Sequence, residues 1–240
     1  MARTTRSGSK SKAPSKTAAA PSAREPAASP AAAASAGPGL SGSGGGRRAT
    51  VERKTAETHI TVTLNVDGQG DTLMRSGIGF LDHMLTALGK HSLMDIGVQA
   101  KGDLHVDFHH TVEDCGIVIG QALREALGSK AGVTRYGFAS VPLDEAVTRA
   151  TVDLSGRPYF EIHGTWPKGK VGEFDVELGE DFFRALAMEG RMNLHLELVS
   201  GRNLHHILET GFKAVARALR MAVAIDAREA GRVPSTKGMI

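Results

Sequence analysis

Residues 109–127 read HHTVEDCGIVIGQALREAL, and the pattern that opens this stretch occurs twice in the chain. The apolar residues follow helical spacing up to Gly128, so the stretch predicts an amphipathic helix that begins with a His-His-x-x-Glu motif. The same motif returns 96 residues later, at His205-His-Ile-Leu-Glu209, and another helical apolar run follows it. A motif that recurs with its flanking helix indicates an internal repeat.

The elements expected around the motif also recur in order. In the first half we expect strands at 58–67, 72–75, 95–100 and 104–108, a short helix at 80–90 and the motif helix at 111–127. In the second half we expect strands at 146–154, 159–164, 172–178 and 192–199, a short helix at 181–187 and the motif helix at 207–226. This order predicts an internally duplicated α+β fold of two similar halves, about 49–133 and 134–240, each a β-sheet backed by α-helices.

The first 48 residues differ from the rest in composition. They are mostly Ala, Ser, Gly, Pro, Lys and Arg, with no aromatic residue, Val or Ile and a single Leu. Such a segment cannot bury enough apolar surface to offset the entropy of ordering it, so we expect a disordered basic tail at 1–48 and one folded domain at 49–240. The tail is poor in acids and fits an organellar transit peptide as well as a plain extension. We expect a cytoplasmic protein, with a plastid as the alternative if the tail is a transit peptide.

The net charge of +3 arises in the tail. Eight basic residues and one acidic residue precede Ala49, whereas 21 basic and 25 acidic residues stand from Ala49 onward. The folded part is therefore acidic and has no basic stripe with interleaved aromatics, which argues against a nucleic-acid surface. No apolar run approaches the roughly 18 residues of a membrane span. The lone Cys115, in an apolar run, predicts a buried structural thiol and fits a reducing compartment.

The His-His-x-x-Glu motif has the geometry of a metal site. In a helix His109 and Glu113 are four residues apart and His110 and Glu113 are three apart, so each pair can share a face. The two adjacent histidines point about 100° apart, because a helix has about 3.6 residues per turn. They can therefore address two different ions. Two motif copies offer four histidines and two glutamates.

His83 is a further candidate ligand, on the short helix that precedes the first motif helix. The repeat places Asp181 near the corresponding position of the second half, and a carboxylate can replace an imidazole as a ligand. Nitrogen-rich sites with some carboxylate suit Mn, Fe, Co, Ni or Zn better than Mg or Ca, and we favour Mn²⁺. His105 and His195, in similar Leu-His-aliphatic contexts, predict buried structural histidines, and His59 predicts a surface position.

A second group of residues is suited to an anion. Arg135 follows the first motif helix, and Arg157 lies in a Ser-Gly-Arg-Pro turn between strands. The C-terminal Pro234-Ser-Thr-Lys-Gly238 offers hydroxyls, backbone N–H groups and a lysine. Arginine forks and such loops commonly contact phosphate, so together these residues suggest a phosphate site.

Five motifs, in order, resemble the imidazoleglycerol-phosphate dehydratase family. They are Gly79-Phe-Leu-Asp-His-Met-Leu85, His109-His-Thr-Val-Glu-Asp114, Asp153-Leu-Ser-Gly-Arg-Pro-Tyr159, His205-His-Ile-Leu-Glu209 and Pro234-Ser-Thr-Lys-Gly238. The resemblance runs from about Val51 to the end. It implies a hydro-lyase that removes water from D-erythro-imidazole glycerol phosphate to give imidazole acetol phosphate in L-histidine biosynthesis. It also implies two Mn²⁺ per active site and a homo-oligomer of 24 subunits built from trimers, with metal sites shared between subunits.

The resemblance assigns roles to particular residues. It implies metal ligands at His83, His109, His110, Glu113, His205, His206 and Glu209, substrate contacts at Glu57, His83, Arg135, Arg157, Lys213, Ser235 and Lys237, and proton transfer by Glu57 or Glu209. The family usually has His where this chain has Asp181, which we keep as a further candidate ligand. From the residues alone, another dinuclear metalloenzyme, such as a hydrolase, and a non-enzymatic metal-binding protein remain alternatives.

Overall fold

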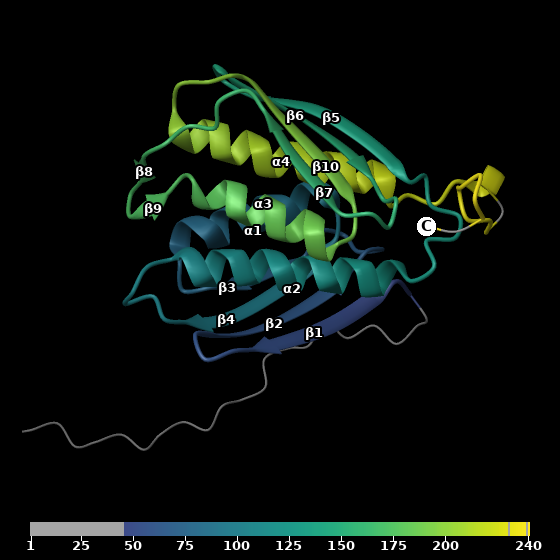
Figure 1. Cartoon of the computed structure of the whole chain (residues 1–240), viewed down its shortest axis with the longest axis horizontal. Helices are drawn as coiled ribbons and strands as arrows, with labels where there is room; N and C mark the ends of the chain where they lie inside the picture. Colours follow the sequence, from purple (N-terminus) through teal and green to yellow (C-terminus); the bar gives the residue numbers. More distant parts are fainter. Residues whose placement is uncertain (1–45, 230, 239) are drawn as a thin grey trace, which may run out of the picture. The chain divides into compact units, whose positions relative to one another are not determined.

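A computed structural model describes residues 46–229, 231–238 and 240. The predicted tail lies outside the described residues except for its last three positions. The described chain contains two four-stranded sheets and four long helices (Figure 1). Among the described residues, no helix is both long enough and apolar enough to cross a membrane.

The two sheets have the same topology. The first contains β1 (Arg48–Lys54), β2 (Thr58–Asn65), β3 (Thr72–Arg75) and β4 (Asp95–Gly102), in the spatial order β1-β2-β4-β3. The second contains β5 (Tyr136–Leu143), β6 (Ala146–Asp153), β7 (Tyr159–His163) and β10 (Asn193–Ser200), in the order β5-β6-β10-β7. In each sheet the edge strand β3 or β7 is parallel to its neighbour and the other pairs are antiparallel. The strand-for-strand match confirms the duplication.

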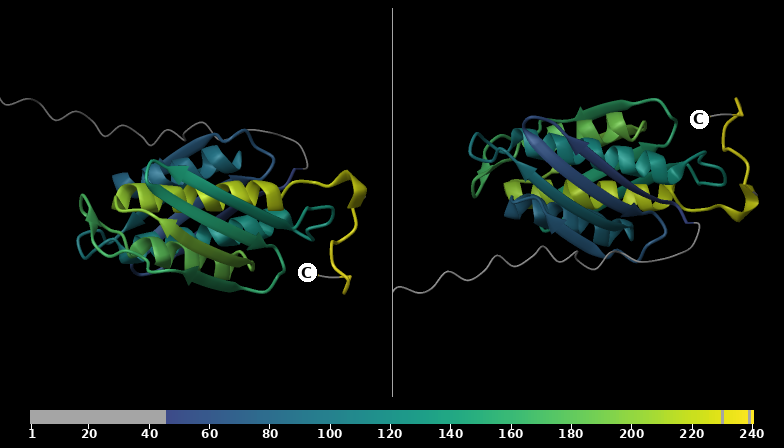
Figure 2. Two further views of the ribbon diagram at one scale, coloured as in Figure 1. Left: turned by 90° about the horizontal axis from the view of Figure 1, so that it is seen from above. Right: turned by 90° about the horizontal axis from the view of Figure 1, so that it is seen from below.

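Helices fill the space between the two sheets. They are α1 (Gly79–Ser92), α2 (His109–Leu127), α3 (Leu178–Glu189) and α4 (Leu204–Ala222). Helices α1 and α2 contact the first sheet, α3 and α4 contact the second, and the two layers meet through the pairs α2/α3 and α1/α4. Figures 1 and 2 show this sheet–helix–helix–sheet sandwich. Each sheet buries one face because only one side is covered by helices, as the in–out alternation of β2 shows.

The core runs through both helix layers. Its largest side chains are fully buried and include Phe182 and Phe183 on α3 and Phe212 on α4. The ring centroid of Phe212 lies 4.9 Å from that of Phe182 and 4.6 Å from that of Phe183. These rings fix the start of α3 against the first half of α4. The motif residues next to them are therefore carried on a rigid support.

Some predicted elements differ from the observed ones. Strands β1 and β5 were not predicted, although each is the edge strand that starts its sheet. The strand predicted at 104–108 is a turn, and the one predicted at 172–178 is the short hairpin of β8 (Lys170–Val171) and β9 (Phe174–Asp175) followed by α3. Short alternations in a single sequence do not distinguish a strand from a turn, because the pairing partner is distant in sequence.

Candidate metal and anion sites

Both motif helices begin with the same local contact. The backbone N–H of His109 donates to the side chain of Asp107 at 2.8 Å, and that of His205 donates to the side chain of Asn203 at 3.0 Å. Each contact satisfies one of the free N–H groups of a helix start, two residues after the acceptor. The paired histidines therefore occupy the first turn of α2 and of α4 in the same way.

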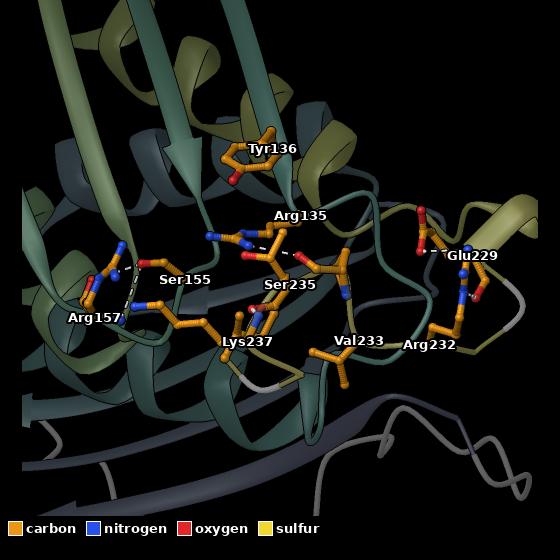
Figure 3. A pocket seen from close by; sticks show the side chains of 12 residues that line it. Arg135, Tyr136, Ser155, Arg157, Glu229, Arg232, Val233, Ser235 and Lys237 are labelled. Carbon is orange, nitrogen blue, oxygen red and sulfur yellow. Dashed lines mark hydrogen bonds and ion pairs between the residues drawn. The ribbon is translucent and has the colours of Figure 1, made fainter.

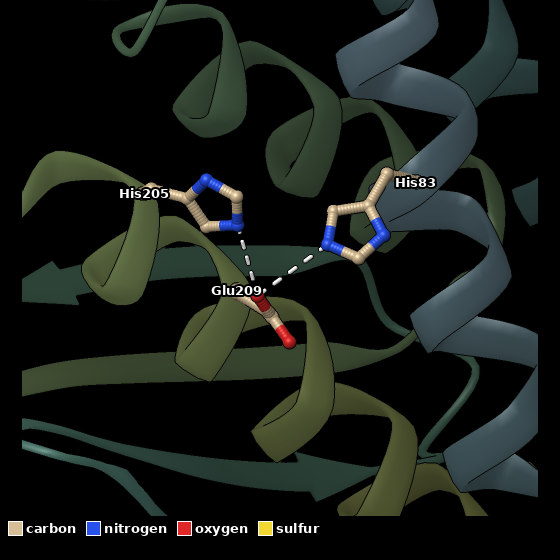
Figure 4. A group of neighbouring side chains, drawn as sticks. All are labelled: His83, His205 and Glu209. Atoms are coloured by element: carbon tan, nitrogen blue, oxygen red, sulfur yellow. Dashed lines mark hydrogen bonds and ion pairs between the residues drawn. The ribbon is translucent and has the colours of Figure 1, made fainter.

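One cluster forms between α1 and α4 (Figure 4). His83, His205 and Glu209 each offer a ligand atom, and these atoms lie within 4.8 Å of one another. Glu209 Oε2 is 3.0 Å from His205 Nε2 and 3.4 Å from His83 Nε2. Among the described residues this is the one group of three or more donors that meets so tight a limit. Two imidazoles and one carboxylate thus converge from two helices.

Lys213 holds the carboxylate of this cluster from the other side. Its Nζ atom donates to Glu209 Oε1 at 2.6 Å, one helical turn along α4. Burial raises the pKa of Glu209, but the hydrogen bond and charge of Lys213, together with His83, outweigh it and lower that pKa below its usual value. Glu209 is therefore ionised at neutral pH and can accept a proton or bind a cation.

A related but looser group lies between α2, from the first half, and α3, from the second half. His109 Nε2 lies 3.6 Å from Glu113 Oε2, and His109 Nδ1 lies 3.5 Å from Asp181 Oδ2. Asp181 stands in the first turn of α3, directly before the buried Phe182 and Phe183 that anchor this helix. Asp181 and His83 each face the motif helix of the other half, but Asp181 and Glu113 approach opposite nitrogens of the His109 ring.

The second histidine of each pair points to a different carboxylate. His110 Nδ1 is 3.0 Å from Asp103 Oδ2, and His206 Nδ1 is 2.9 Å from Glu145 Oε2. The predicted catalytic acid Glu57 lies 3.8 Å from the other ring nitrogen of His110, Nε2. Hydrogen bonding to Asp103 raises the pKa of His110, against the effect of its desolvation. Hydrogen bonds from His206 and from the backbone lower the pKa of Glu145 to about 2.

Asp103 and Glu145 were missed by the sequence analysis. Asp103 lies six residues before His109 in the connection between β4 and α2, and Glu145 lies in the turn between β5 and β6. The contact from Glu145 to His206 spans 61 residues. No local spacing signals a pair so far apart. The only local signal was an acidic residue in a tight turn, and acidic residues are common in exposed turns of any function.

The predicted anion residues line one open groove (Figure 3). Its volume is about 750 Å³, and Arg135, Ser155, Arg157, Ser235 and Lys237 are among its lining residues. Arg157 and Lys237 are exposed, and the backbone N–H of Lys237 donates to Ser235 Oγ at 3.2 Å. Cationic and hydroxyl groups around a concave surface are suited to bind a phosphate.

Arg135 also supports the groove. Its Nε and Nη2 atoms donate to Asp153 at 2.7 and 3.2 Å, and its Nη1 atom donates to the carbonyl of Pro234 at 2.8 Å. Hydrogen bonding to Asp153 raises the pKa of this arginine. The side chain therefore joins the second sheet to the C-terminal segment that carries Ser235 and Lys237.

Four further histidines, His59, His105, His163 and His195, are not among the donors of either group. His105 is exposed in a turn, so the prediction of a buried structural histidine is wrong for it. His195 is half-buried on β10, and its Nδ1 atom lies 3.0 Å from Nε2 of His163. His59 is exposed beside Glu52, which confirms its surface position.

Comparison with known proteins adds independent evidence. The sequence model of the family described as imidazoleglycerol-phosphate dehydratase matches residues 76–219. The imidazoleglycerol-phosphate dehydratase of Gluconobacter oxydans is 58% identical over 194 residues, which cover 81% of this chain and 98% of that protein. The enzyme of the same name from Gluconacetobacter diazotrophicus is 54% identical with the same coverage.

Solved structures give the same result. The crystal structure of imidazoleglycerol-phosphate dehydratase from Staphylococcus aureus has a TM-score of 0.67 and 40% identity, covering 74% of this chain and 98% of that one. The structure of the Pyrococcus furiosus protein in complex with (S)-C348 has a TM-score of 0.68 and 36% identity, covering 79% of this chain and all of that one. The shared region includes both halves of the repeat.

Proposed function

The chain belongs to the imidazoleglycerol-phosphate dehydratase family of hydro-lyases in histidine biosynthesis, and we propose that it performs this dehydration with two Mn²⁺ ions per active site. The observation that carries the proposal is the convergence of His83, His205 and Glu209 from α1 and α4. Family membership also decides against the hydrolase and the non-enzymatic alternatives.

The donor atoms suit such an ion. The cluster of His83, His205 and Glu209 has two imidazoles and one carboxylate. The group around His109 offers one imidazole, with the carboxylate of Glu113 near its Nε2 atom and that of Asp181 near its Nδ1 atom. Nitrogen and oxygen donors without a thiolate suit Mn²⁺ and its first-row neighbours better than they suit soft, thiolate-preferring ions. Bound there, a divalent ion would act as a Lewis acid and would orient the imidazole of the substrate.

The protein side chains would then move the protons. The substrate must lose a hydroxyl from the carbon next to its imidazole ring and a hydrogen from the following carbon, which together leave as water. The hydrogen is not next to a carbonyl, so expulsion of the hydroxyl requires electrons from the ring after its N–H proton is removed. Glu209, kept ionised by Lys213, and Glu57, beside His110, are the carboxylates placed to accept and return these protons.

The anion groove lies beyond the C-terminal ends of α2 and α4, whereas the metal ligands lie in the first turns of these helices. The groove of a neighbouring subunit would therefore fix the far end of the substrate. Arg157, Ser235 and Lys237 are its accessible phosphate contacts, and Arg135 holds the segment that carries two of them. Contacts to a remote, non-reacting phosphate would supply orientation at the reacting carbons.

The protein is proposed to act as a homo-oligomer, the 24-subunit assembly of trimers that the resemblance implies. In one chain the cluster of His83, His205 and Glu209 has three donors and the group around His109 offers fewer to any one ion, whereas an octahedral ion has roughly six positions. His110 and His206 lie outside both groups, and their Nε2 atoms are not the ones bonded to Asp103 and Glu145. They would complete the metal sites of a neighbouring subunit.

We place the enzyme in the cytoplasm, since its single cysteine is buried and unpaired, as is usual in a reducing compartment. The plastid alternative depends on the tail, which lies outside the described residues. No nucleic-acid or membrane partner is proposed.

The test is turnover of imidazole glycerol phosphate by the full chain. Activity should be lost with a chelator, return with Mn²⁺, and fall by orders of magnitude in His205→Ala, while His59→Ala, on the exposed face of β2, should retain it. Light scattering should give a mass far above that of one subunit. Full activity of chelated, metal-free protein would refute the metal proposal, and an active monomer would refute the assembly.

A further inference from the structure

Asp103 and Glu145 make the same contact in the two halves of the molecule. Each places one carboxylate oxygen within about 3 Å of the Nδ1 atom of the second histidine in a motif, at 3.0 Å for His110 and 2.9 Å for His206. A carboxylate only accepts hydrogen bonds, so the Nδ1 atom of each ring must carry the hydrogen. Nε2 of a neutral ring then has a free lone pair.

Glu145 is itself held in place. Its Oε1 atom accepts the backbone N–H groups of Arg202 at 3.1 Å and Asn203 at 2.7 Å, which leaves Oε2 for His206. Asp144, beside it in the turn, adopts a left-handed backbone with φ of 47°. The carboxylate thus joins the β5–β6 turn to the residues that begin α4, and its direction toward the imidazole is set by the backbone.

Asp103 reaches His110 from a different part of the fold. It follows β4, in the connection that leads into α2, and its side chain is only 17% exposed. The place that corresponds to Glu145 in the first half is the β1–β2 turn, which carries Glu57, and Glu57 lies 3.8 Å from Nε2 of His110 rather than next to Nδ1. The two Nδ1 contacts are therefore not copies inherited from one duplicated residue.

We propose that Asp103 and Glu145 are positioning residues, which hold His110 and His206 in the Nδ1–H tautomer with Nε2 directed to a divalent metal ion. This inference rests on the proposed metal-dependent function. Metal-binding histidines usually donate their second ring N–H to a carboxylate or carbonyl, which fixes the ring and makes the ligand more basic. Two unrelated structural positions converge on this one contact, which a duplication alone does not explain.

Glu145→Gln is the sharper of two test variants. The backbone N–H groups of Arg202 and Asn203 will hold the amide oxygen, so the amide NH₂ faces His206 Nδ1. Nδ1 must then accept, and the hydrogen moves to Nε2, where it blocks metal binding. Asp103→Asn removes the charge beside His110 with the same volume. Asp144→Asn and Asp71→Asn are controls, since each removes an exposed negative charge and leaves the Nδ1 contacts intact.

The readout is Mn²⁺ binding by the full-length protein, measured by equilibrium dialysis with elemental analysis. His110 and His206 would bind different ions, so each test variant should affect about half of the Mn²⁺ sites. The affinity of those sites should fall by roughly 10–100-fold, the usual cost of losing such a partner. The controls should bind as wild type does. Thermal unfolding of the metal-free variants, checked in parallel, should stay close to wild type.

A double-mutant cycle distinguishes positioning from general support. If Asp103 acts through His110, Asp103→Asn should cause no further loss of affinity in a His110→Ala background, and the same should hold for Glu145→Gln with His206→Ala. An equal loss in both backgrounds, or wild-type affinity in both single variants, would overturn the inference. Wild-type protein that binds no Mn²⁺ would instead refute the proposed metal-dependent function.

Discussion

The Oδ2 atom of Asp181 lies 3.5 Å from the Nδ1 atom of His109, at the place where the other half of the molecule uses an imidazole. His83 occupies that place in the first cluster, 3.4 Å from Glu209. The two clusters therefore differ in one donor, with a second carboxylate in place of a second histidine. Oxygen-richer sites favour Mn²⁺ more strongly over softer ions.

Asp181→Ala should lower the affinity for one of the two Mn²⁺ ions per subunit by about tenfold or more. This loss is at least as large as the loss caused by removing an outer-shell partner. Asp181→His should equalise the clusters and shift the preference of that site from Mn²⁺ toward Zn²⁺. Metal competition followed by elemental analysis measures both effects. Glu180→Gln, the neighbouring acid that pairs with Arg184, is the control. Unchanged binding in Asp181→Ala would exclude this residue as a ligand.

Arg157→Ala and Lys237→Ala should each raise KM for the phosphorylated substrate by roughly 10–100-fold, the size of a lost charge-assisted hydrogen bond. A contact to the non-reacting phosphate forms before the chemical step, so kcat should fall less than KM rises. Steady-state kinetics gives KM and kcat, and inhibition by inorganic phosphate tests the phosphate site separately. Arg228→Ala, an exposed arginine outside the groove, should change neither parameter. If KM stayed at its wild-type value in both variants, the phosphate would have to bind elsewhere.

Gly120→Ala should destabilise the fold by about 1–3 kcal/mol, although alanine is the better helix former. A Cβ atom at Gly120 would lie 2.8 Å from the backbone of both Gly190 and Leu186, so α2 and α3 could no longer approach closely. Gly79→Ala is the matched control, since a Cβ there meets nothing within 4 Å. Denaturant unfolding monitored by circular dichroism compares the two. Equal stability would show that the helices can separate at no cost.

Cys115 should resist alkylation in the native protein up to at least pH 9. The side chain is fully buried on α2, and burial raises the pKa of its thiol far above the usual range, so almost no thiolate forms. Iodoacetamide labelling followed by mass spectrometry should detect modification only after unfolding. Rapid labelling of the folded enzyme would mean that this helix opens locally.

Much of the fold could be predicted because the repeated helices and strands have recognisable periodicity in neighbouring residues. The helix predicted at 111–127 is α2, and the strand predicted at 72–75 is β3. The edge strands β1 and β5 were not predicted, since nearly all of their residues are exposed or half-buried and their sequences resemble loops. The burial of His105 was mispredicted for the same reason, because a Leu-His-aliphatic stretch is buried only if a strand forms around it.

The amino-acid sequence by itself determined the duplicated α+β architecture and the identities of the paired histidines and glutamates, because helical period and motif spacing are properties of neighbouring residues. Tertiary structure alone decided that His83 joins His205 and Glu209, that Asp181 faces His109, and that Asp103 and Glu145 bind the remaining rings. These contacts join residues from separate helices, turns and halves. Their distances depend on how two helix layers pack between two sheets, which no local pattern records.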